Sequence, residues 1–400
     1  MNPNRLLLLL PVLLLSACNI DNEPLGVRRE LVGDKDVGGI LKKTLAAAPD
    51  DTTIAAIVNT GISPYLLAGG QKNVTSEFLI RFAKVDSAAV AGVVKQAKLI
   101  LPIHLVVEEP KYYFGTVHEL AAYRVTQTWR EDSVTAGNLT PPYFDPAAVG
   151  RARHPSRSSW HRNDGARRDT LYLPLDSTYV QTWADDSTDV LIRSLDRGIL
   201  FEFYSSESVV ANPRLEVLVR RNERPDTTFR YPAQADAFVF QREAPVPADR
   251  FFSGNGEKHQ TYLHFTPLDS MPGNATINRA ILTLNIDREH SAINQDHFTC
   301  SVFLVDAILD SNQQKGDTLY YRLLANVSGT RVISAEAAKF EVDLTGSVQS
   351  WVTFPESNKG LTIEPIYFNW DLQRVAFHSQ ASNPALAPRL TVDFTTPPEN

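Results

Sequence analysis

Cysteine is nearly absent from this chain: only Cys18 and Cys300 occur in 400 residues. Two cysteines, one of them close to the amino terminus, give no disulfide framework, so the folded part must be stabilised by buried apolar cores. Long apolar segments are missing too. The run from Leu6 to Leu15 is about half of the roughly 20 residues that a membrane-spanning helix needs, and no second such run follows. We therefore expect no membrane-spanning helix.

Motifs that carry catalysis or bind cofactors are also lacking. The sequence has no His-Glu-x-x-His zinc motif, no Gly-x-Ser-x-Gly nucleophile turn, no phosphate-binding glycine loop and no cysteine pair for a metal. The densest polar cluster, Asp287 to His290 with Asp296 and His297, offers oxygen and nitrogen ligands, but a solvated loop explains it equally well. We predict no metal, no cofactor and no enzymatic activity.

Positive charge is in deficit, with 39 Lys and Arg against 46 Asp and Glu. Removal of residues 1–17, whose only charged side chain is Arg5, gives a net charge of 38 − 46 = −8. A net negative chain is a poor partner for nucleic acid. We expect no nucleic-acid partner.

The first residues have the order of a secretory signal. Arg5 precedes the apolar run, and small residues follow it at a cleavage site. Leu15-Ser16-Ala17-Cys18 resembles the lipobox of bacterial lipoproteins; a cysteine that merely lies near a cleavage site is the alternative. The resemblance implies that residues 1–17 are a signal peptide and that acyl chains on Cys18 are the membrane anchor. Asn19 and the acidic residues that follow it resemble the sequence after the lipidated cysteine in outer-membrane lipoproteins. The resemblance implies an outer-membrane lipoprotein that faces either the periplasm or the exterior.

The rest of the chain has the pattern of an all-β protein. Residues 18–51 are polar or small and are interpreted as a flexible tether. Beyond them, short segments rich in Val, Ile, Leu, Phe and Tyr alternate with clusters of Pro, Gly, Asn and Asp. The 25 prolines argue against long helices.

This β-rich part repeats itself. Phe82 and Phe265 are each followed, 15 residues later, by an Ala-x-Leu-x-Leu strand. Three further pairs occur in the same order: Val180-Gln181-Thr182-Trp183 with Val348-Gln349-Ser350-Trp351, Arg197-Gly198-Ile199 with Lys359-Gly360-Leu361, and Asn212-Pro213-Arg214-Leu215 with Ala387-Pro388-Arg389-Leu390. The repeat predicts two tandem domains, 52–222 and 223–400.

These landmarks, together with Tyr123 to Trp129 and the serine turns at Ser205 and Ser379, resemble the DNRLRE-type domain. That domain is a jelly-roll module of bacterial and archaeal cell-surface proteins, related to a carbohydrate-binding module family. The resemblance covers nearly all of residues 52–397 and implies two tandem jelly-roll β-sandwich domains that bind carbohydrate. The second copy lacks a counterpart of Trp129.

The repeated tryptophans favour a structural role. A tryptophan after an amphipathic segment packs between two sheets more often than it serves as a ligand platform, so Trp183 and Trp351 are predicted to be core residues. Cys300, within an apolar strand pattern, is also predicted to be buried.

One segment departs from the acidic character of the chain. Residues 151–168 contain six arginines and two histidines, with Asp164 as the only acidic residue. Arginine binds carboxylates, sulfates or phosphates bidentately, and tryptophan stacks on sugars. The candidate ligand-binding residues are Arg151, Arg153, Arg157, Trp160, Arg162, Arg167 and Arg168. A long inter-strand insertion, rich in arginine for solubility, is the alternative.

A second candidate is the aromatic segment Tyr367 to Asp371. Neighbouring residues of a strand point to opposite faces, so at least one of these aromatic side chains is predicted to be exposed or covered by another surface. Tyr367 and Trp370 are the candidate ligand-binding residues of this segment. An interface with the other domain or a partner, and stacking on a sugar, both fit.

Three functions follow from these observations. The preferred one is a non-catalytic cell-envelope lipoprotein that binds an acidic polysaccharide or another surface glycan. The alternative is a structural or assembly lipoprotein that binds another envelope protein. A polysaccharide-active enzyme ranks third, because glycosidases need two carboxylates at a set distance, and no motif indicates such a pair.

Overall fold

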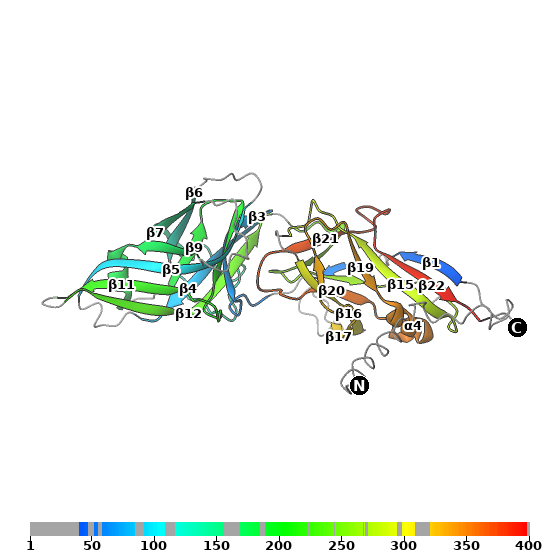
Figure 1. Cartoon of the computed structure of the whole chain (residues 1–400). Helices are drawn as coiled ribbons and strands as arrows, with labels where there is room; N and C mark the ends of the chain where they lie inside the picture. Colours follow the sequence, from blue (N-terminus) through cyan, green and yellow to red (C-terminus); the bar gives the residue numbers. More distant parts are fainter. Residues whose placement is uncertain are drawn as a thin grey trace, which may run out of the picture.

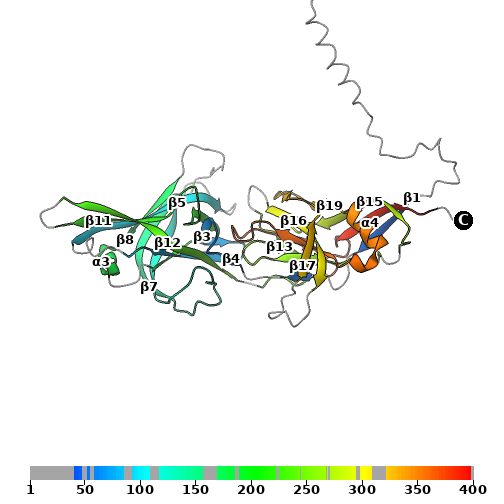
Figure 2. The ribbon, with the colours of Figure 1, turned by 90° about the horizontal axis from the view of Figure 1, so that it is seen from below.

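The structure, a computed structural model, describes residues 40–46, 52–54, 58–84, 92–108, 117–155, 169–184, 189–221, 225–243, 245–266, 268, 271–293, 298–308 and 321–397. They form two β-sandwich bodies that lie end to end (Figures 1 and 2). The predicted all-β sandwich class is therefore confirmed. Within the described residues, no helix is long and apolar enough to cross a membrane. The predicted signal peptide and Cys18 lie outside this part of the chain.

Body 1 comprises residues 58–243. Its elements are β3 (Tyr65–Gln71), β4 (Val74–Phe82), β5 (Val93–Glu108), β6 (Val117–Val125), β7 (Phe144–Pro155), β8 (Thr170–Leu175), α3 (Ser177–Gln181), η2 (Thr182–Ala184), β9 (Asp189–Ser194), β10 (Ile199–Tyr204), β11 (Arg214–Arg220) and β12 (Thr227–Arg242). Strand β5 pairs with β11 and β8 in its first part and with β10 in its last part. The pairing β10-β3-β4-β12-β11-β5 consequently closes on itself around a core that includes Phe78, Phe201 and Leu215.

Body 2 comprises residues 40–54 and 245–397. Its elements are β1 (Ile40–Ala46), β2 (Thr52–Ile54), β13 (Arg250–Gly254), β14 (Gln260–Leu263), β15 (Thr276–Asn285), β16 (Phe298–Ile308), β17 (Tyr321–Asn326), β18 (Arg331–Ile333), β19 (Lys339–Asp343), α4 (Thr345–Thr353), η5 (Pro355–Ser357), β20 (Leu361–Pro365), β21 (Arg374–His378) and β22 (Arg389–Thr395). The sheet β1-β22-β15-β19 and the sheet β17-β16-β20-β14-β2 share one core, which contains Leu282, Leu390 and Ile363. Cys300 is buried in it, as predicted.

The repeated Val-Gln-x-Trp motif has a structural role in both bodies. It lies on the short helices α3-η2 and α4, where the glutamine side chain binds two backbone groups at the start of an earlier strand, β5 in body 1 and β15 in body 2. The bonds are Gln181 Oε1 with Val94 N (2.8 Å), Gln181 Nε2 with Gly92 O (3.2 Å), Gln349 Oε1 with Ile277 N (2.8 Å) and Gln349 Nε2 with Ala275 O (3.1 Å). The tryptophan then enters the core, with 0% of Trp183 and 3% of Trp351 exposed. The prediction that both are core residues is confirmed.

The strand pairing corrects the predicted domain boundary at 222/223. Strand β12 belongs to body 1, because it pairs with β11 over residues 227–232 and with β4 over residues 233–242. The polar link around Pro225 is thus the connection of an antiparallel pair, β11 and β12, rather than a linker between domains.

The predicted tether 18–51 is also corrected. Residues 40–46 form β1, which pairs with the last strand, β22, in body 2. Of the side chains described in β1, only Leu45 is buried. The strand is held mainly by backbone hydrogen bonds, which any sequence can form, so its pattern is too weak to be recognised.

The two flanking strands occupy equivalent places. In body 1, β12 pairs first with the closing strand β11 and then with β4. In body 2, β1 pairs with the closing strand β22 and β2 pairs with β14. The flanking strand of body 1 therefore comes after its closing strand in the sequence, whereas the flanking strands of body 2, β1 and β2, come before all its other strands. In Figure 1 this is visible as β1, in blue, beside β22, in red.

One predicted landmark pair is wrong. Strand β20, which follows Gly360, pairs with β14 and β16, as β9 pairs with β4 and β6. Strand β10, which follows Gly198, corresponds instead to β21, since β10 pairs with β3 and β21 pairs with β13. Both glycines have a positive φ, 92° and 82°, at the entry to a strand, so the likeness is local.

Candidate functional site

The outer face of body 1 carries a second layer of chain. Residues 126–143, called here the covering segment, bury Trp129, Val134 and Leu139 against Leu79 and Leu191 of the sheet. The sheet formed by β4, β9 and β6 is therefore packed on both faces, with the main core on its inner side and this smaller cluster on its outer side.

A hollow of about 370 Å³ lies beside the covering segment. This volume falls within the range of small-ligand pockets. The lining is provided by β3, β4, β9, β12, the segment after β9 and the covering segment. Its polar and charged side chains are those of Thr75, Ser76, Glu77, Tyr143, Arg193, Ser194, Asp196, Arg197 and Gln241.

Three side chains form the centre of the hollow. Arg193 donates to Glu77 Oε2 through Nε and Nη2, each at 2.5 Å, and the Tyr143 hydroxyl donates to Glu77 Oε1. The guanidinium of Arg193 lies 4.7 Å from the centre of the Phe144 ring. Burial and the neighbouring Glu77 raise the pKa of Tyr143 well above its ordinary value, so the hydroxyl remains protonated at neutral pH. The hollow thus has a fixed polar floor next to an aromatic ring.

Arg151 faces the same side of the sheet as the hollow. The register places Glu77 opposite Arg193, Arg193 opposite Ala121, and Ala121 opposite Arg151. Directly opposed residues of antiparallel strands share one face. Because the side chains of a strand alternate, Arg153 is on this face too. We call Arg151, Arg153 and Arg193 the arginine row.

Glu119 lies between the exposed members of the arginine row. Arg151 Nη1 donates to Glu119 Oε1 at 2.5 Å, and Arg153 Nε is 3.6 Å from Glu119 Oε2. The hydrogen bond from Arg151 holds the pKa of Glu119 below its ordinary value. Asp196 of the hollow accepts a hydrogen bond from the Glu119 backbone N–H at 2.9 Å, so the row and the hollow are adjacent.

The first part of the arginine-rich segment is a strand, so the alternative of an inter-strand insertion does not apply to it. Residues 151–155 complete β7. The other predicted ligand-binding residues of this segment lie outside the described residues: Arg157, Trp160, Arg162, Arg167 and Arg168.

Tyr367 and Trp370 lie between the two bodies, in the turn between β20 and β21. Their rings stack at 4.0 Å, and Trp370 meets Tyr65 of body 1 edge-on at 5.8 Å. Tyr65 in turn stacks on His104 at 4.2 Å. Leu372, from the same turn, is buried within the core cluster of body 1. Of the two predicted alternatives, the geometry corresponds to the interface with the other domain.

Polar contacts also join the bodies. Arg242 at the end of β12 donates to Glu257 of body 2, with Nη2 to Oε2 at 2.9 Å. The Lys72 ammonium, in the turn between β3 and β4, donates to the backbone carbonyl of Ser291. The junction is therefore both apolar and charged, and Tyr367 and Trp370 belong to it rather than to the arginine row.

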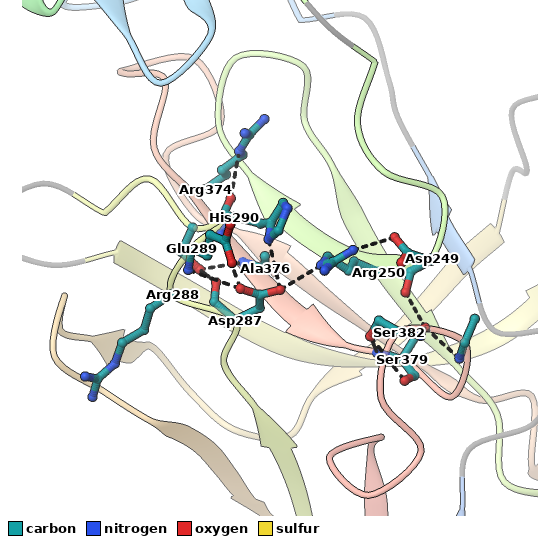
Figure 3. Close-up of polar contacts among 12 residues, drawn as sticks. Asp249, Arg250, Asp287, Arg288, Glu289, His290, Arg374, Ala376, Ser379 and Ser382 are labelled. Carbon is teal, nitrogen blue, oxygen red and sulfur yellow. Dashed lines mark hydrogen bonds and ion pairs between the residues drawn. The ribbon is translucent and has the colours of Figure 1, made fainter.

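A second polar centre lies in body 2 near this junction (Figure 3). Asp287 accepts a hydrogen bond from Arg250 Nε at 2.6 Å and lies 3.0 Å from His290 Nδ1. Burial alone would raise the pKa of Asp287, but the hydrogen bonds from Arg250 and His290 outweigh it and hold the pKa at about 2. Asp287, Glu289 and His290 could together offer ligands to a metal. Arg250 already compensates Asp287, however, so the network is complete without a cation.

Glu77, Tyr143 and Arg193 were not predicted as site residues. Glu77 is 66 residues from Tyr143 and 116 from Arg193. The register of β4 against β9 places Glu77 opposite Arg193, and the covering segment brings Tyr143 to Glu77. The alternation in Leu191-Ile192-Arg193, with a charge in an apolar strand, is the one signal that sequence could have offered.

No family model and no curated protein matches the chain. One solved structure, of T=1 particles derived from infectious bursal virus, aligns over 92% of this chain and 76% of that chain, with 8% identity and a TM-score of 0.08. A score this low carries no argument about fold or function.

Proposed function

We propose that this protein is a non-catalytic envelope lipoprotein that binds an acidic glycan on the outer face of body 1. The observation that supports this function is the arginine row beside a polar hollow. Guanidinium groups on one face bind uronate carboxylates or sulfates, and the hollow has the size to hold sugar hydroxyl groups. Arg157, Arg162, Arg167 and Arg168 follow Arg153 in the sequence and add positive charge to the same part of the chain. The resemblance to a carbohydrate-binding module supports the same proposal.

The position of β1 supports an arrangement in which body 1 is distal to the membrane. Strand β1 begins at Ile40, which pairs with Thr395, and β1 and β22 lie at the side of body 2 that is far from body 1 (Figure 1). If Cys18 carries the acyl chains, 40 − 18 = 22 residues separate the anchor from β1. Such a segment spans at most about 75 Å. Body 2 then lies next to the membrane, and the arginine row belongs to the distal body.

Binding is favoured over catalysis because the carboxylates of the hollow already have partners. Glu77 accepts from Arg193 and Tyr143, and Asp196 accepts from the Glu119 backbone. A general acid or base must be able to reach the substrate, and both oxygens of Glu77 are already engaged by side chains of the protein.

The test is retention on immobilised polyuronate and sulfated glycan at low and high salt. The Arg151→Ala, Arg153→Ala double variant should lose at least tenfold in affinity, because two exposed cationic groups are removed without disturbing the core. Tyr143→Phe should weaken binding by a smaller factor. Arg230→Ala is the matched control, since Arg230 is equally exposed and also pairs across strands, with Glu216 at 3.0 Å.

Two results would refute the proposal. One is that the protein is retained on no acidic polymer. The other is that the double variant binds as tightly as the wild-type protein while Arg230→Ala does not.

Binding to another envelope protein is the second candidate, and one surface favours it. Val209 is 100% exposed, and Ile62 on the adjacent loop is 59% exposed. The two loops are joined by the hydrogen bond from Ser205 Oγ to the Ser63 carbonyl at 2.6 Å. An Ile62→Asp, Val209→Asp variant should lose a partner that the wild-type protein retains in detergent, whereas glycan retention should not change.

A further inference from the structure

Three carboxylates meet in body 1 outside the hollow. Glu131 belongs to the covering segment, Glu207 to the turn after β10, and Asp236 to β12. One oxygen of each lies within 4.8 Å of the others. We call these residues the carboxylate triad. Three separate chain segments therefore place like charges at one point.

Asp236 is the buried member of the triad, with 1% of its surface exposed. Its Oδ2 accepts a hydrogen bond from the Ser206 backbone N–H at 2.8 Å. Its Oδ1 is buried and has no hydrogen-bond partner in the described part of the chain. A buried carboxylate oxygen without a partner is costly, because the water that it loses on folding is not replaced.

The nearby positive charge does not compensate the triad. Arg81 acts on Glu131, but it donates to Asp189 through Nε at 2.6 Å and Nη2 at 2.9 Å. Burial and then the charge of Glu207 raise the pKa of Asp236 well above its ordinary value, and burial also raises that of Glu131. Left to itself, the triad is electrostatically unbalanced.

The triad is held in place by groups other than its own charges. Glu131 Oε1 accepts from the Asp236 backbone N–H at 2.8 Å. A Cβ atom on Gly61 would lie only 2.2 Å from the Glu131 carbonyl oxygen, so the backbones pack closely there. Asn212 Nδ2 fixes the turn that carries Glu207 by donating to the carbonyl oxygens of Ser205 (3.3 Å), Ser206 (2.9 Å) and Ser208 (3.0 Å). Such a rigid arrangement of oxygens is what a cation site requires.

We propose that the carboxylate triad binds a calcium ion, with Asp236 Oδ1 as its buried ligand. Calcium takes oxygen ligands at about 2.3–2.6 Å, so two ligands of one ion lie at most about 5 Å apart. The triad satisfies this condition. Magnesium keeps several waters and rarely accepts a site built of protein carboxylates alone. Glu207 is exposed, so the ion enters from solvent and water completes its coordination.

The ion would join the covering segment to β12 and to the turn after β10. Glu131 and Tyr143 both belong to the covering segment, so calcium would also stabilise the wall of the hollow. The calcium proposal does not depend on the glycan proposal, because it can be tested without any glycan.

The first test is thermal unfolding of the full chain in detergent, after chelator treatment and titration with Ca²⁺ or Mg²⁺. Calcium should raise the Tm saturably, and magnesium at the same concentration should raise it far less. Asp236→Asn should abolish the calcium response, and Glu207→Gln should raise the half-saturating Ca²⁺ concentration at least tenfold. Glu216→Gln, a carboxylate of body 1 outside the triad, is the control and should respond as wild type.

Terbium provides a direct second readout. Trp129 is two residues from Glu131 and should sensitise the luminescence of Tb³⁺ bound at the triad. Trp129→Phe should lose most of this luminescence but keep its calcium-dependent rise in Tm. Added Ca²⁺ should displace Tb³⁺ from the wild-type protein.

Three outcomes would overturn the proposal. The first is that calcium does not change the Tm of the wild-type protein. The second is that Glu207→Gln has the same half-saturating Ca²⁺ concentration as the wild type, which places any ion elsewhere. The third is that Asp236→Asn is more stable than the wild type while calcium has no effect, which indicates that the carboxylates share a proton instead of an ion. If Asp236→Asn does not fold, Glu207→Gln decides, because its side chain is exposed.

Discussion

The two bodies are built to the same plan but with different connectivity. Body 1 is one continuous stretch whose strand pairing closes on itself, whereas body 2 is assembled from both ends of the described chain. Leu45 pairs with Leu390, which is 390 − 45 = 345 residues later. The entropy cost of closing so long a loop delays this pairing. Body 1, which lies between the two parts of body 2 in the sequence, should therefore fold first, and β1 should pair with β22 afterwards.

The bodies also differ in what is added to the plan. Body 1 has the covering segment, the hollow and the carboxylate triad. Body 2 has a longer turn between β20 and β21, eight residues (366–373) against four (195–198) between β9 and β10. That turn packs against body 1. Body 1 thus carries an additional layer with a hollow, and body 2 carries an additional contact that joins the two bodies.

The largest expected effect is the loss of body 2 when residues 40–54 are deleted. Residues 58–243 should fold alone, because all strands of body 1 are included. Residues 245–397 alone should not, since both sheets lose an edge strand. A circular permutant that joins Thr395 through a short turn to residues 40–54 should restore folding, because Thr395 is opposite Ile40.

Circular dichroism and urea unfolding of the separate bodies measure this difference. A cooperative transition of residues 245–397 at the same urea concentration as the permutant would show that the flanking strand is dispensable. The difference in connectivity between the bodies would then have no effect on the stability of body 2.

The second effect concerns acid. Burial lowers the pKa of His259 in body 2 to about 4, against 6.5 for the free side chain, although Glu257 opposes the shift. The unfolded state therefore binds the proton more readily. Body 2 keeps this stability above pH 6.5 and should lose up to about 3 kcal/mol as the pH falls to 4. His259→Phe should remove this dependence, as measured by urea unfolding at each pH.

Body 1 should behave in the opposite way in calcium-free buffer. Burial raises the pKa of Asp236, so the folded state binds this proton more readily than the unfolded state. Body 1 should therefore gain stability as the pH falls through the raised pKa of Asp236. Body 2 should therefore unfold first on acidification. A wild-type protein in which body 1 unfolds first would contradict both assignments.

A smaller difference is expected between two equivalent glycines. Gly69 in β3 has φ +127°, and a Cβ there would lie 2.0 Å from the Ile199 carbonyl oxygen. Gly254 in β13 has no such φ, and its Cβ would meet Arg374 Cβ at 2.7 Å. Gly69→Ala should cost about 1–2 kcal/mol more than Gly254→Ala, because the strained φ adds to the steric clash. Equal losses in urea unfolding would mean that β3 can shift as easily as β13.

How far the sequence could predict this molecule depended on whether side chains or backbone carry each element. Apolar alternation identified the all-β class, and the order of landmarks identified two copies. Trp183 and Trp351 were recognised because large aromatic residues in repeated positions are usually core. Strand β1 was missed because only Leu45 is buried among its described side chains.

The candidate sites were harder to predict for a related reason. Arg151 and Arg153 were found because arginine is conspicuous in an acidic chain. Glu77 and Arg193 were not, because each is an ordinary strand residue until the register places them opposite one another. Asp236 is the only acidic residue of β12, and Glu131 and Glu207 come from other segments. When a site is made by residues that pair across a sheet, those residues have no fixed spacing in the sequence by which the site could be recognised.

The smallest effect concerns the junction, where Trp370→Ala removes the stack on Tyr367 and the edge contact with Tyr65. Aromatic pairs are worth about 0.5–1.5 kcal/mol, so the thermal transitions of the two bodies should separate by a few degrees in calorimetry. Tyr172→Ala, an exposed aromatic residue of body 1, is the control and should leave them unchanged. Unchanged coupling together with lost glycan retention would mean that Trp370 serves a ligand, and the division of roles between the bodies would fail. Separated transitions with intact retention would assign Trp370 to the junction and leave binding to body 1.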